Sequence, residues 1–188
     1  MKQARTLTDA QLRQVIAFCA TRKYALRDQT IVQVSFYAGL RAMEIAALRI
    51  SDVYDQTGEV RSQFTLTADQ TKGQVVRSVY VNRKLRRALE QYQPLVAQRN
   101  RNAALFATQL GTAFSANSMC QLFFKIYSDC GMQGASSHSG RRTFITKLAN
   151  TGVNVRLLAA LAGHRHISTT QRYIDVNDAQ LARAVELI

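Results

Sequence analysis

LAGHRHISTTQRY, residues 161–173, contains two of the three histidines of the chain and one tyrosine. It ends on Tyr173, nine residues after His164. The glycine before His164 is the residue type that ends a helix and turns the chain. A second helix is predicted to begin at Ser168, which with Gln171 has the spacing of a capping box. We therefore expect a turn that brings His164 and Tyr173 to the same point in space.

A tyrosine close to a histidine is usually a core or surface residue, so this stretch alone does not define a site. The ordinary pKa of a phenol is about 10, and catalytic use of Tyr173 would require nearby cations and a proton acceptor. His164 and His166 are also candidate metal ligands. No third histidine and no cysteine or carboxylate cluster has suitable spacing near them, so we predict no metal site.

Cationic and proton-accepting side chains occur in two other short stretches. In HSGRR, residues 138–142, His138 precedes Arg141 by three positions, which places both on one side of a helix. In GLRAME, residues 39–44, Arg41 follows a glycine, and Glu44 one turn later can orient it through a charge-assisted hydrogen bond. Each pair by itself is an ordinary surface pattern.

The overall charge indicates a polyanionic partner. The chain has 25 Lys and Arg against 12 Asp and Glu, a formal net charge of +13, which favours nucleic acid first and an anionic membrane surface second. No apolar run of membrane-spanning length and no apolar signal segment is found, so we expect a cytosolic protein. Three cysteines without CxxC spacing predict reduced thiols rather than disulfides or zinc ligands.

The predicted fold is mainly α with a small antiparallel β hairpin, an α+β domain. The 188 residues are 47% hydrophobic, show no linker, and are expected to form one domain over 1–188. The hairpin is predicted between residues 60 and 82, where β-branched residues flank the turn DQTKGQ. Helices are predicted to begin after Thr8 and to cover 27–38, 41–53, 83–92, 115–130, 141–151, 154–162 and 177–188.

The ordered set of motifs carries more information than any one of them. YAGLRAMEIAALRISDV, then TKG in the hairpin turn, then HSGRRTFIT, then LAGH and a tyrosine nine residues on resemble the catalytic domain of the tyrosine recombinases, also called the phage integrase family. The resemblance covers residues 7–188, and this order and spacing is specific. It implies the fold of that catalytic domain.

The resemblance also implies a catalytic role for each matching residue. The positions matched are Arg41, Lys72, His138, Arg141, His164 and Tyr173, with Glu44 as the acidic companion of the first arginine. It implies that Tyr173 attacks a DNA phosphodiester held by both arginines and His164. His138 would accept the phenolic proton, and Lys72 would protonate the departing 5′ oxygen. The expected product is a 3′-phosphotyrosyl link, formed without metal, ATP or another cofactor.

Two positions depart from the usual family pattern. The family usually has Leu within its HxLR motif, where this chain has Gly140, and the usual LGH reads here as Leu161, Ala162, Gly163 and His164. Gly140 removes a packing side chain at a helix start. We therefore expect reduced local rigidity there.

The resemblance implies double-stranded DNA as the partner, with self-association on DNA as a dimer or tetramer, or pairing with another recombinase. Arg83, Lys84, Arg86 and Arg87 are candidates for contacts to the phosphate backbone, although a solvated helix face explains them equally well. Segment 177–188 is expected to be a protomer-exchange tail, with packing on its own domain as the alternative. The N-terminal DNA-clamp domain of most members is expected to be absent. Two explanations stay open: the chain is a fragment of a longer protein, or it resembles naturally short members such as the fimbrial phase-switch invertases.

Three functions stay open at this point. The first is a site-specific DNA recombinase for integration, excision or inversion. The second is a DNA-binding regulator of another recombinase with idle cleavage, and the third is a relaxing topoisomerase. The complete residue set favours the first, because a pure regulator gains nothing from keeping Tyr173 together with Lys72 and both arginines.

Overall fold

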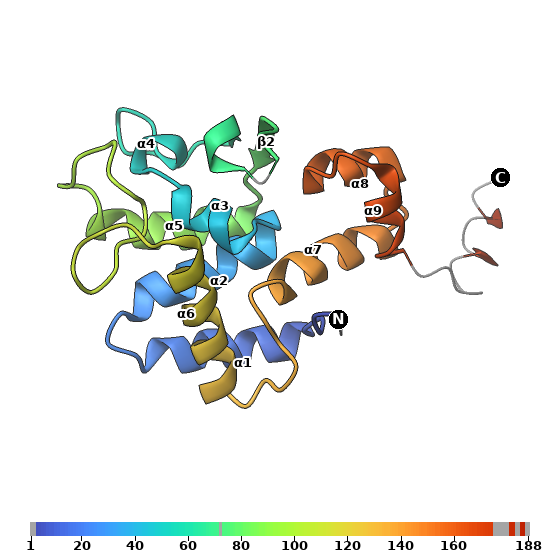
Figure 1. Ribbon diagram of the computed structural model, residues 1–188, viewed down its shortest axis with the longest axis horizontal. Helices are drawn as coiled ribbons and strands as arrows, with labels where there is room; N and C mark the ends of the chain where they lie inside the picture. Colours follow the sequence, from blue (N-terminus) through green and yellow to red (C-terminus); the bar gives the residue numbers. More distant parts are fainter. Residues whose placement is uncertain (1–2, 72, 175–180, 183–184, 187–188) are drawn as a thin grey trace.

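The computed structural model describes residues 3–71, 73–174, 181–182 and 185–186. Figure 1 shows a mainly helical molecule in which α7 runs from the main body toward α8 and α9. In chain order the elements are α1 (Asp9–Ala20), α2 (Ala25–Ala38), α3 (Ala42–Ala47), α4 (Ile50–Val53), β1 (Gln63–Leu66), the 3₁₀ helix η1 (Ala68–Gln70), β2 (Arg77–Tyr80), α5 (Arg83–Tyr92), the 3₁₀ helix η2 (Gln93–Leu95), α6 (Ala116–Asp129), α7 (Ser139–Asn150), α8 (Val155–Ala162) and α9 (Ile167–Gln171). The predicted mainly α fold with one small hairpin is confirmed.

Capping residues set the ends of several helices as predicted. Thr8 caps α1 through a capping box, because its hydroxyl accepts from the Gln11 N–H at 3.2 Å and its own N–H donates to the Gln11 side chain at 3.0 Å. Gly39 ends α2 in the left-handed conformation, with φ of +64°. The Asn82 side chain accepts from the Leu85 N–H and starts α5.

Two local predictions are wrong. The segment 41–53 is not one helix, because Leu48 and Arg49 are extended between α3 and α4; the Leu48 carbonyl accepts from the Leu105 N–H at 2.7 Å. Pairing with a distant strand-like segment therefore overrides the local helical pattern. The capping box at Ser168 is also wrong, because α9 begins at Ile167 and Ser168 lies inside it.

The hairpin places one arginine on its buried face. β1 and β2 pair antiparallel, and the register sets Phe64 opposite Val79 and Leu66 opposite Arg77. All four side chains are buried, so they form the inward face of the alternation. Arg77 therefore projects into the molecule from the first residue of β2.

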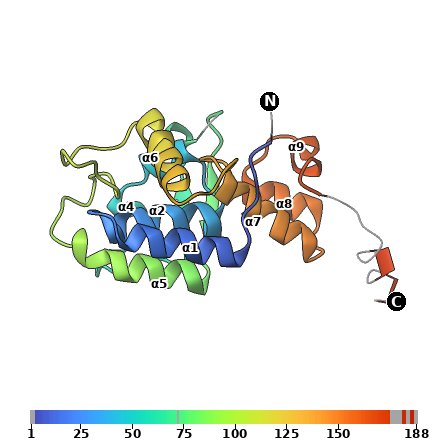
Figure 2. The ribbon, with the colours of Figure 1, turned by 90° about the horizontal axis from the view of Figure 1, so that it is seen from below.

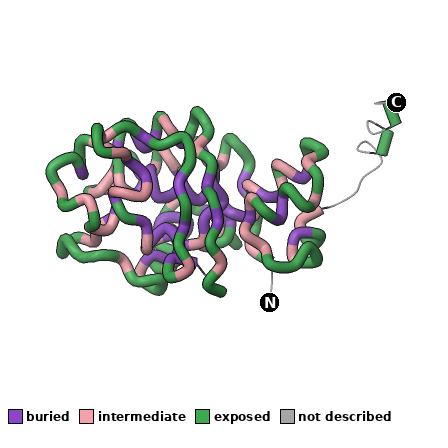
Figure 3. Tube along the Cα trace, turned by 90° about the horizontal axis from the view of Figure 1, so that it is seen from above, coloured by how far each residue is buried: buried purple, intermediate pink, exposed green. Residues whose placement is uncertain are grey.

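Most of the core belongs to one cluster, and a smaller one lies at the C-terminal end. The main cluster extends through α1 to α6 and includes Val15, Ile31 and Phe123. The second cluster joins α7 and α8 around Ile145 and Leu158. Figure 2 shows α7 connecting the two regions, and Figure 3 shows buried chain in both. A packed contact between α2 and α7 holds the regions together.

Gly140 lies where α7 packs closely against Ser35 of α2. It is buried, and a Cβ atom at this position would lie 2.3 Å from Ser35 Oγ and 3.0 Å from the Ser35 backbone carbonyl carbon. A larger side chain would push the helices apart. The expected loss of rigidity is therefore wrong, because the missing side chain permits direct helix contact.

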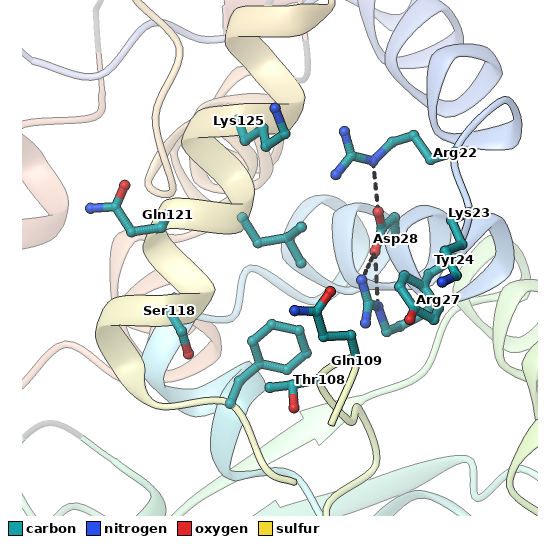
Figure 4. A pocket seen from close by; sticks show the side chains of 12 residues that line it. Arg22, Lys23, Tyr24, Arg27, Asp28, Thr108, Gln109, Ser118, Gln121 and Lys125 are labelled. Carbon is teal, nitrogen blue, oxygen red and sulfur yellow. Dashed lines mark hydrogen bonds and ion pairs between the residues drawn. The ribbon is translucent and has the colours of Figure 1, made fainter. Parts of the chain in front are cut away.

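An ion-pair network lines a hollow at the N-terminal end of α2 (Figure 4). The buried Asp28 carboxylate accepts from Arg22 Nε and lies 2.8 Å from Arg27 Nη2. The Arg27 guanidinium also lies over the rings of Tyr24 and Phe114, and it donates to the Ala107 carbonyl. These contacts attach the loop before α6 to the start of α2.

Within the described residues, no helix has both the length and the apolar character needed to cross a membrane. Of the predicted helix over 177–188, only residues 181–182 and 185–186 are among those described. Its role as a tail stays a prediction.

Substituting Gly140→Ala is expected to lower the free energy of unfolding by about 1–3 kcal/mol through overpacking against Ser35, although alanine is the better helix former. Urea unfolding measures this value. Combining Gly140→Ala with Ser35→Gly removes the closest atoms, so the double variant is expected to be more stable than the sum of the single changes predicts. A Gly140→Ala protein more stable than wild type would contradict the close contact.

Candidate active site

A buried carboxylate organises the predicted site residues. Glu44, in α3, has no solvent exposure. Its Oε1 accepts from Arg41 Nη1 at 2.7 Å, and its Oε2 accepts from the Arg41 backbone N–H at 2.9 Å and from Arg77 Nη2 at 2.8 Å. Burial by itself would raise the pKa of Glu44, but Arg77, Arg41 and Arg141 together hold this pKa below its ordinary value. The carboxylate is therefore ionised and fully engaged.

Arg41 lies at the N-terminus of α3, directly after the turn that ends α2. Glu44 fixes its guanidinium from one side, while 20% of the Arg41 side chain stays exposed. The predicted orientation of this arginine by the acid one turn later agrees with these contacts. Arg41 is thus a cation fixed by Glu44, and part of its side chain is accessible to solvent.

Arg141, in the first turn of α7, is held by the ends of two other helices. Its Nη1 donates to the Gly39 carbonyl at 2.8 Å, and its Nη2 donates to the Ala162 carbonyl at 2.6 Å. These carbonyls lie at the C-termini of α2 and α8, where the helix dipoles favour a cation. Burial and the neighbouring arginines lower the Arg141 pKa to about 9, which leaves the group charged at neutral pH.

His164 and Tyr173 are brought together by the turn that follows α8. Their ring centroids are 5.8 Å apart and the planes differ by 26°, a stacked arrangement. His164 Nδ1 lies 2.8 Å from the hydroxyl of Thr170, a buried residue of α9. The guanidinium carbon of Arg142 lies 5.6 Å from the centre of the Tyr173 ring. The phenol ring therefore has both His164 and Arg142 as neighbours.

The site has an excess of positive charge. Arg41, Arg77 and Arg141 provide three cations against the carboxylate of Glu44, an excess of two. Burial, followed by these three arginines, lowers the pKa of His164 to about 4. His164 is therefore neutral at neutral pH, and the site has the charge to hold an anion.

The structure places the remaining predicted catalytic residues as follows. His138 is at the N-cap of α7, one turn before Arg141. Lys72 lies outside the described residues, so its predicted role stays a prediction. His166 is exposed at the N-cap of α9. Among the described residues, no three His, Cys, Asp or Glu side chains are grouped so that they could hold a metal ion.

Arg77 is the site residue that sequence analysis missed. It is 7% exposed, and its Nη1 donates to the Leu161 carbonyl at 2.7 Å while its Nη2 contacts Glu44. The available signal was its position in the strand pattern: Arg77 shares the inward face with Val79. A charged residue on a buried strand face requires a partner, and such a partner indicates a structured polar site.

The four basic residues predicted to contact DNA lie on α5. Arg83, Lys84 and Arg87 are exposed. Arg86 is half-buried and donates to the Val60 carbonyl at 2.5 Å, so it attaches α5 to the segment before β1. The exposed trio remains a candidate for phosphate contacts.

Comparison with solved structures defines the class of fold. XerA recombinase superposes with a TM-score of 0.77 at 24% identity, covering 99% of this chain and 66% of that one. The catalytic domain of bacteriophage HP1 integrase gives a TM-score of 0.69 at 21% identity, covering 98% of this chain and 95% of that one. The fold is that of the tyrosine recombinase catalytic domain.

Sequence comparison identifies the family. The model of the phage integrase family matches residues 5–180, and the chain belongs to this family. Tyrosine recombinase XerD of Oceanobacillus iheyensis is 28% identical over 165 residues, 85% of this chain and 53% of the relative. Tyrosine recombinase XerC of Proteus mirabilis is 32% identical over 171 residues, 86% of this chain and 52% of the relative. The chain spans about half the length of these relatives.

The low pKa of His164 predicts a pH dependence of stability. The folded pKa is about 4 against an ordinary value of 6.5, so the unfolded chain binds the proton more readily between these values. Stability conferred by neutral His164 is therefore fully present above pH 6.5 and is lost as the pH falls toward 4. Melting temperatures of wild type are expected to fall more steeply over this interval than those of His164→Gln. Parallel curves for the two proteins would contradict the burial of a neutral imidazole.

Proposed function

We propose that this chain acts as the catalytic domain of a site-specific DNA recombinase, with Tyr173 as the nucleophile. The observation that carries the proposal is a cluster with an excess of two positive charges, in which Arg41 and Arg141 both act on His164 and the His164 ring stacks on Tyr173. Attack on a phosphodiester builds negative charge on its nonbridging oxygens. Rigidly held guanidinium groups stabilise that charge most effectively where water is excluded.

The reaction forms one ester bond and breaks another. The Tyr173 oxygen bonds to phosphorus, the bond from phosphorus to the 5′ oxygen breaks, and a 3′-phosphotyrosyl link results. His138 is proposed to accept the phenolic proton, and Lys72 to supply the proton for the leaving 5′ oxygen. Because one ester replaces another, a 5′ hydroxyl of a second strand can reverse the step without metal or ATP.

Each arginine has a distinct place in this scheme. Arg141 donates one N–H from each Nη to a carbonyl, and each Nη carries a second hydrogen for a phosphate oxygen. Arg41 is held by Glu44 through Nη1 and has an exposed edge for the same phosphate. Neutral His164, oriented by Thr170, adds a further hydrogen bond.

Double-stranded DNA is the proposed substrate. The net charge of +13 favours it. Support also comes from relatives: the Tn1549 transposon integrase is solved in complex with circular intermediate DNA, and XerH recombinase is solved bound to its difH substrate. Assembly as a dimer or tetramer on DNA, use of 177–188 as an exchanged tail, pairing with another recombinase and a cytoplasmic location belong to the same proposal.

The alternative is a DNA-binding regulator of another recombinase with idle cleavage. It is disfavoured because Glu44 and Arg77 are buried to support Arg41, an arrangement that binding alone does not require. A topoisomerase that only relaxes DNA would use the same covalent step. The two enzymatic functions differ in whether strands are exchanged between sites.

A covalent DNA adduct tests the chemistry. Wild type and Tyr173→Phe are incubated, without metal, with a nicked suicide duplex carrying a candidate site from DNA flanking the gene, and run on a denaturing gel. A shifted species is expected with wild type and is expected to be lost with Tyr173→Phe. Tyr80→Phe is the matched control, because Tyr80 is an exposed tyrosine of β2.

The outcomes separate the functions. An adduct that survives in Tyr173→Phe would contradict the assignment of the nucleophile. Salt-sensitive binding without any adduct on the tested sites would favour the regulator. An adduct followed by joining of two sites would support recombination over relaxation.

Neutralising the exposed basic residues of α5 tests the DNA footprint. The triple variant Arg83→Gln, Lys84→Gln and Arg87→Gln is expected to reduce the slope of log Kd against log salt by up to about 3, because each phosphate that these side chains neutralise contributes about one unit of slope. Arg13→Gln, Lys23→Gln and Lys125→Gln change the net charge equally at other exposed positions. Equal slopes in both variants would remove these three residues of α5 from the footprint.

A further inference from the structure

We infer that Arg77 is a positioning residue that fixes Arg41 relative to His164. The inference rests on the proposed function. One planar guanidinium joins two elements that carry different parts of the site: Nη2 contacts Glu44 of α3, which holds Arg41, and Nη1 contacts the Leu161 carbonyl in the last turn of α8. His164 follows that turn within three residues.

The turn after α8 is shaped around the Arg77 side chain. A Cβ atom at position 163 would lie 2.4 Å from Arg77 Cδ and 3.0 Å from its Nε. Gly163 also has a left-handed φ of +62°, which other residues rarely adopt. Glycine at 163 therefore serves two needs: it reverses the chain before His164, and it lets Arg77 pass close to the backbone.

The contacts of Arg77 lead inward rather than toward substrate. Both terminal nitrogens are engaged, and the side chain is 5% exposed. Its Nε is buried and has no hydrogen-bond partner among the described residues. Such an unpaired donor is unfavourable, and the two charge-assisted contacts at the other nitrogens offset it. Arg77 thus acts on the reaction through Glu44 and α8.

If Arg77 has this role, removing it breaks specific contacts of Glu44 and of α8. Without Arg77, Glu44 Oε2 keeps only the Arg41 backbone N–H, and the Leu161 carbonyl loses its side-chain donor. The main cluster and the α7–α8 cluster would then lose the polar connection that Arg77 makes between them. A displacement of about 1 Å at such a place lowers a rate by about 100-fold.

The test compares Arg77→Met, which removes every donor, with Arg77→Lys, which keeps the charge but has one ammonium group in place of the planar fork. The readouts are the single-turnover rate of adduct formation at saturating DNA, DNA affinity, and the NMR titration of the His164 ring. We expect a rate loss of about 100-fold for Arg77→Met and at least about tenfold for Arg77→Lys. DNA affinity is expected to stay within about threefold of wild type, because in this inference Arg77 acts through Glu44 and α8 and does not contact the phosphate.

The pKa of His164 distinguishes the effect of the charge of Arg77 from the effect of its position. Arg141, Arg41, Arg77 and Glu44 are the charged groups acting on this ring. Removing one cation in Arg77→Met is expected to raise the His164 pKa, whereas Arg77→Lys keeps it low while cleavage stays impaired. Full activity in Arg77→Lys would overturn the inference, because charge alone would then explain Arg77.

Arg101→Met is the matched control. Arg101 donates to the Asp55 and Tyr54 carbonyls, neither of which belongs to a site residue, so its loss removes comparable hydrogen bonds. Adduct formation by this variant is expected to stay near wild type. Equal rate losses in Arg101→Met and Arg77→Met would show a general stability effect and overturn the inference.

If wild type forms no adduct, the proposed function fails. The His164 ring resonances still test the positioning role in that case, because they are expected to change in both Arg77 variants and not in Arg101→Met.

Discussion

The buried carboxylate of Glu44 is the interaction on which the rest of the site depends. A carboxylate without solvent exposure is tolerated only when cations and hydrogen bonds replace its water, and Arg41 with Arg77 provides them. The reverse also holds: three arginines gathered in one place repel one another unless an anion is held among them. Loss of Glu44 would therefore leave Arg77 buried without a counter-charge and Arg41 without a fixed direction.

The C-terminal ends of α2 and α8 hold Arg141, the third arginine of the site. Gly39 and Gly163 both have left-handed backbone, and each ends a helix at or next to a carbonyl that accepts from Arg141. The guanidinium of Arg141 thus lies where the negative ends of α2 and α8 converge. Apolar contacts within each cluster fix the helices, and this polar junction sets how the clusters meet.

Local patterns predicted the parts of the site that lie close together in sequence. The spacing of Arg41 and Glu44 gives one helical turn, and the glycine after α8 gives the turn that pairs His164 with Tyr173. Arg77 was not predicted, because its partners are 33 and 84 positions away and strand alternation alone does not say which buried residue meets a carboxylate. The meaning of Gly140 likewise depended on the crossing of α2 and α7.

The charge excess suits an anion, which is what the proposed phosphodiester substrate provides. Arg41 and Arg141 are already held by Glu44 and by the Gly39 and Ala162 carbonyls, so an entering anion would find these partners without rearrangement of the protein. Burial, together with the charges of these arginines, keeps His164 neutral, which makes its ring a hydrogen-bond partner rather than a fourth cation. In the proposed reaction, the phosphate charge that develops near Tyr173 would therefore be stabilised by Arg41 and Arg141 and by a hydrogen bond from the neutral His164 ring.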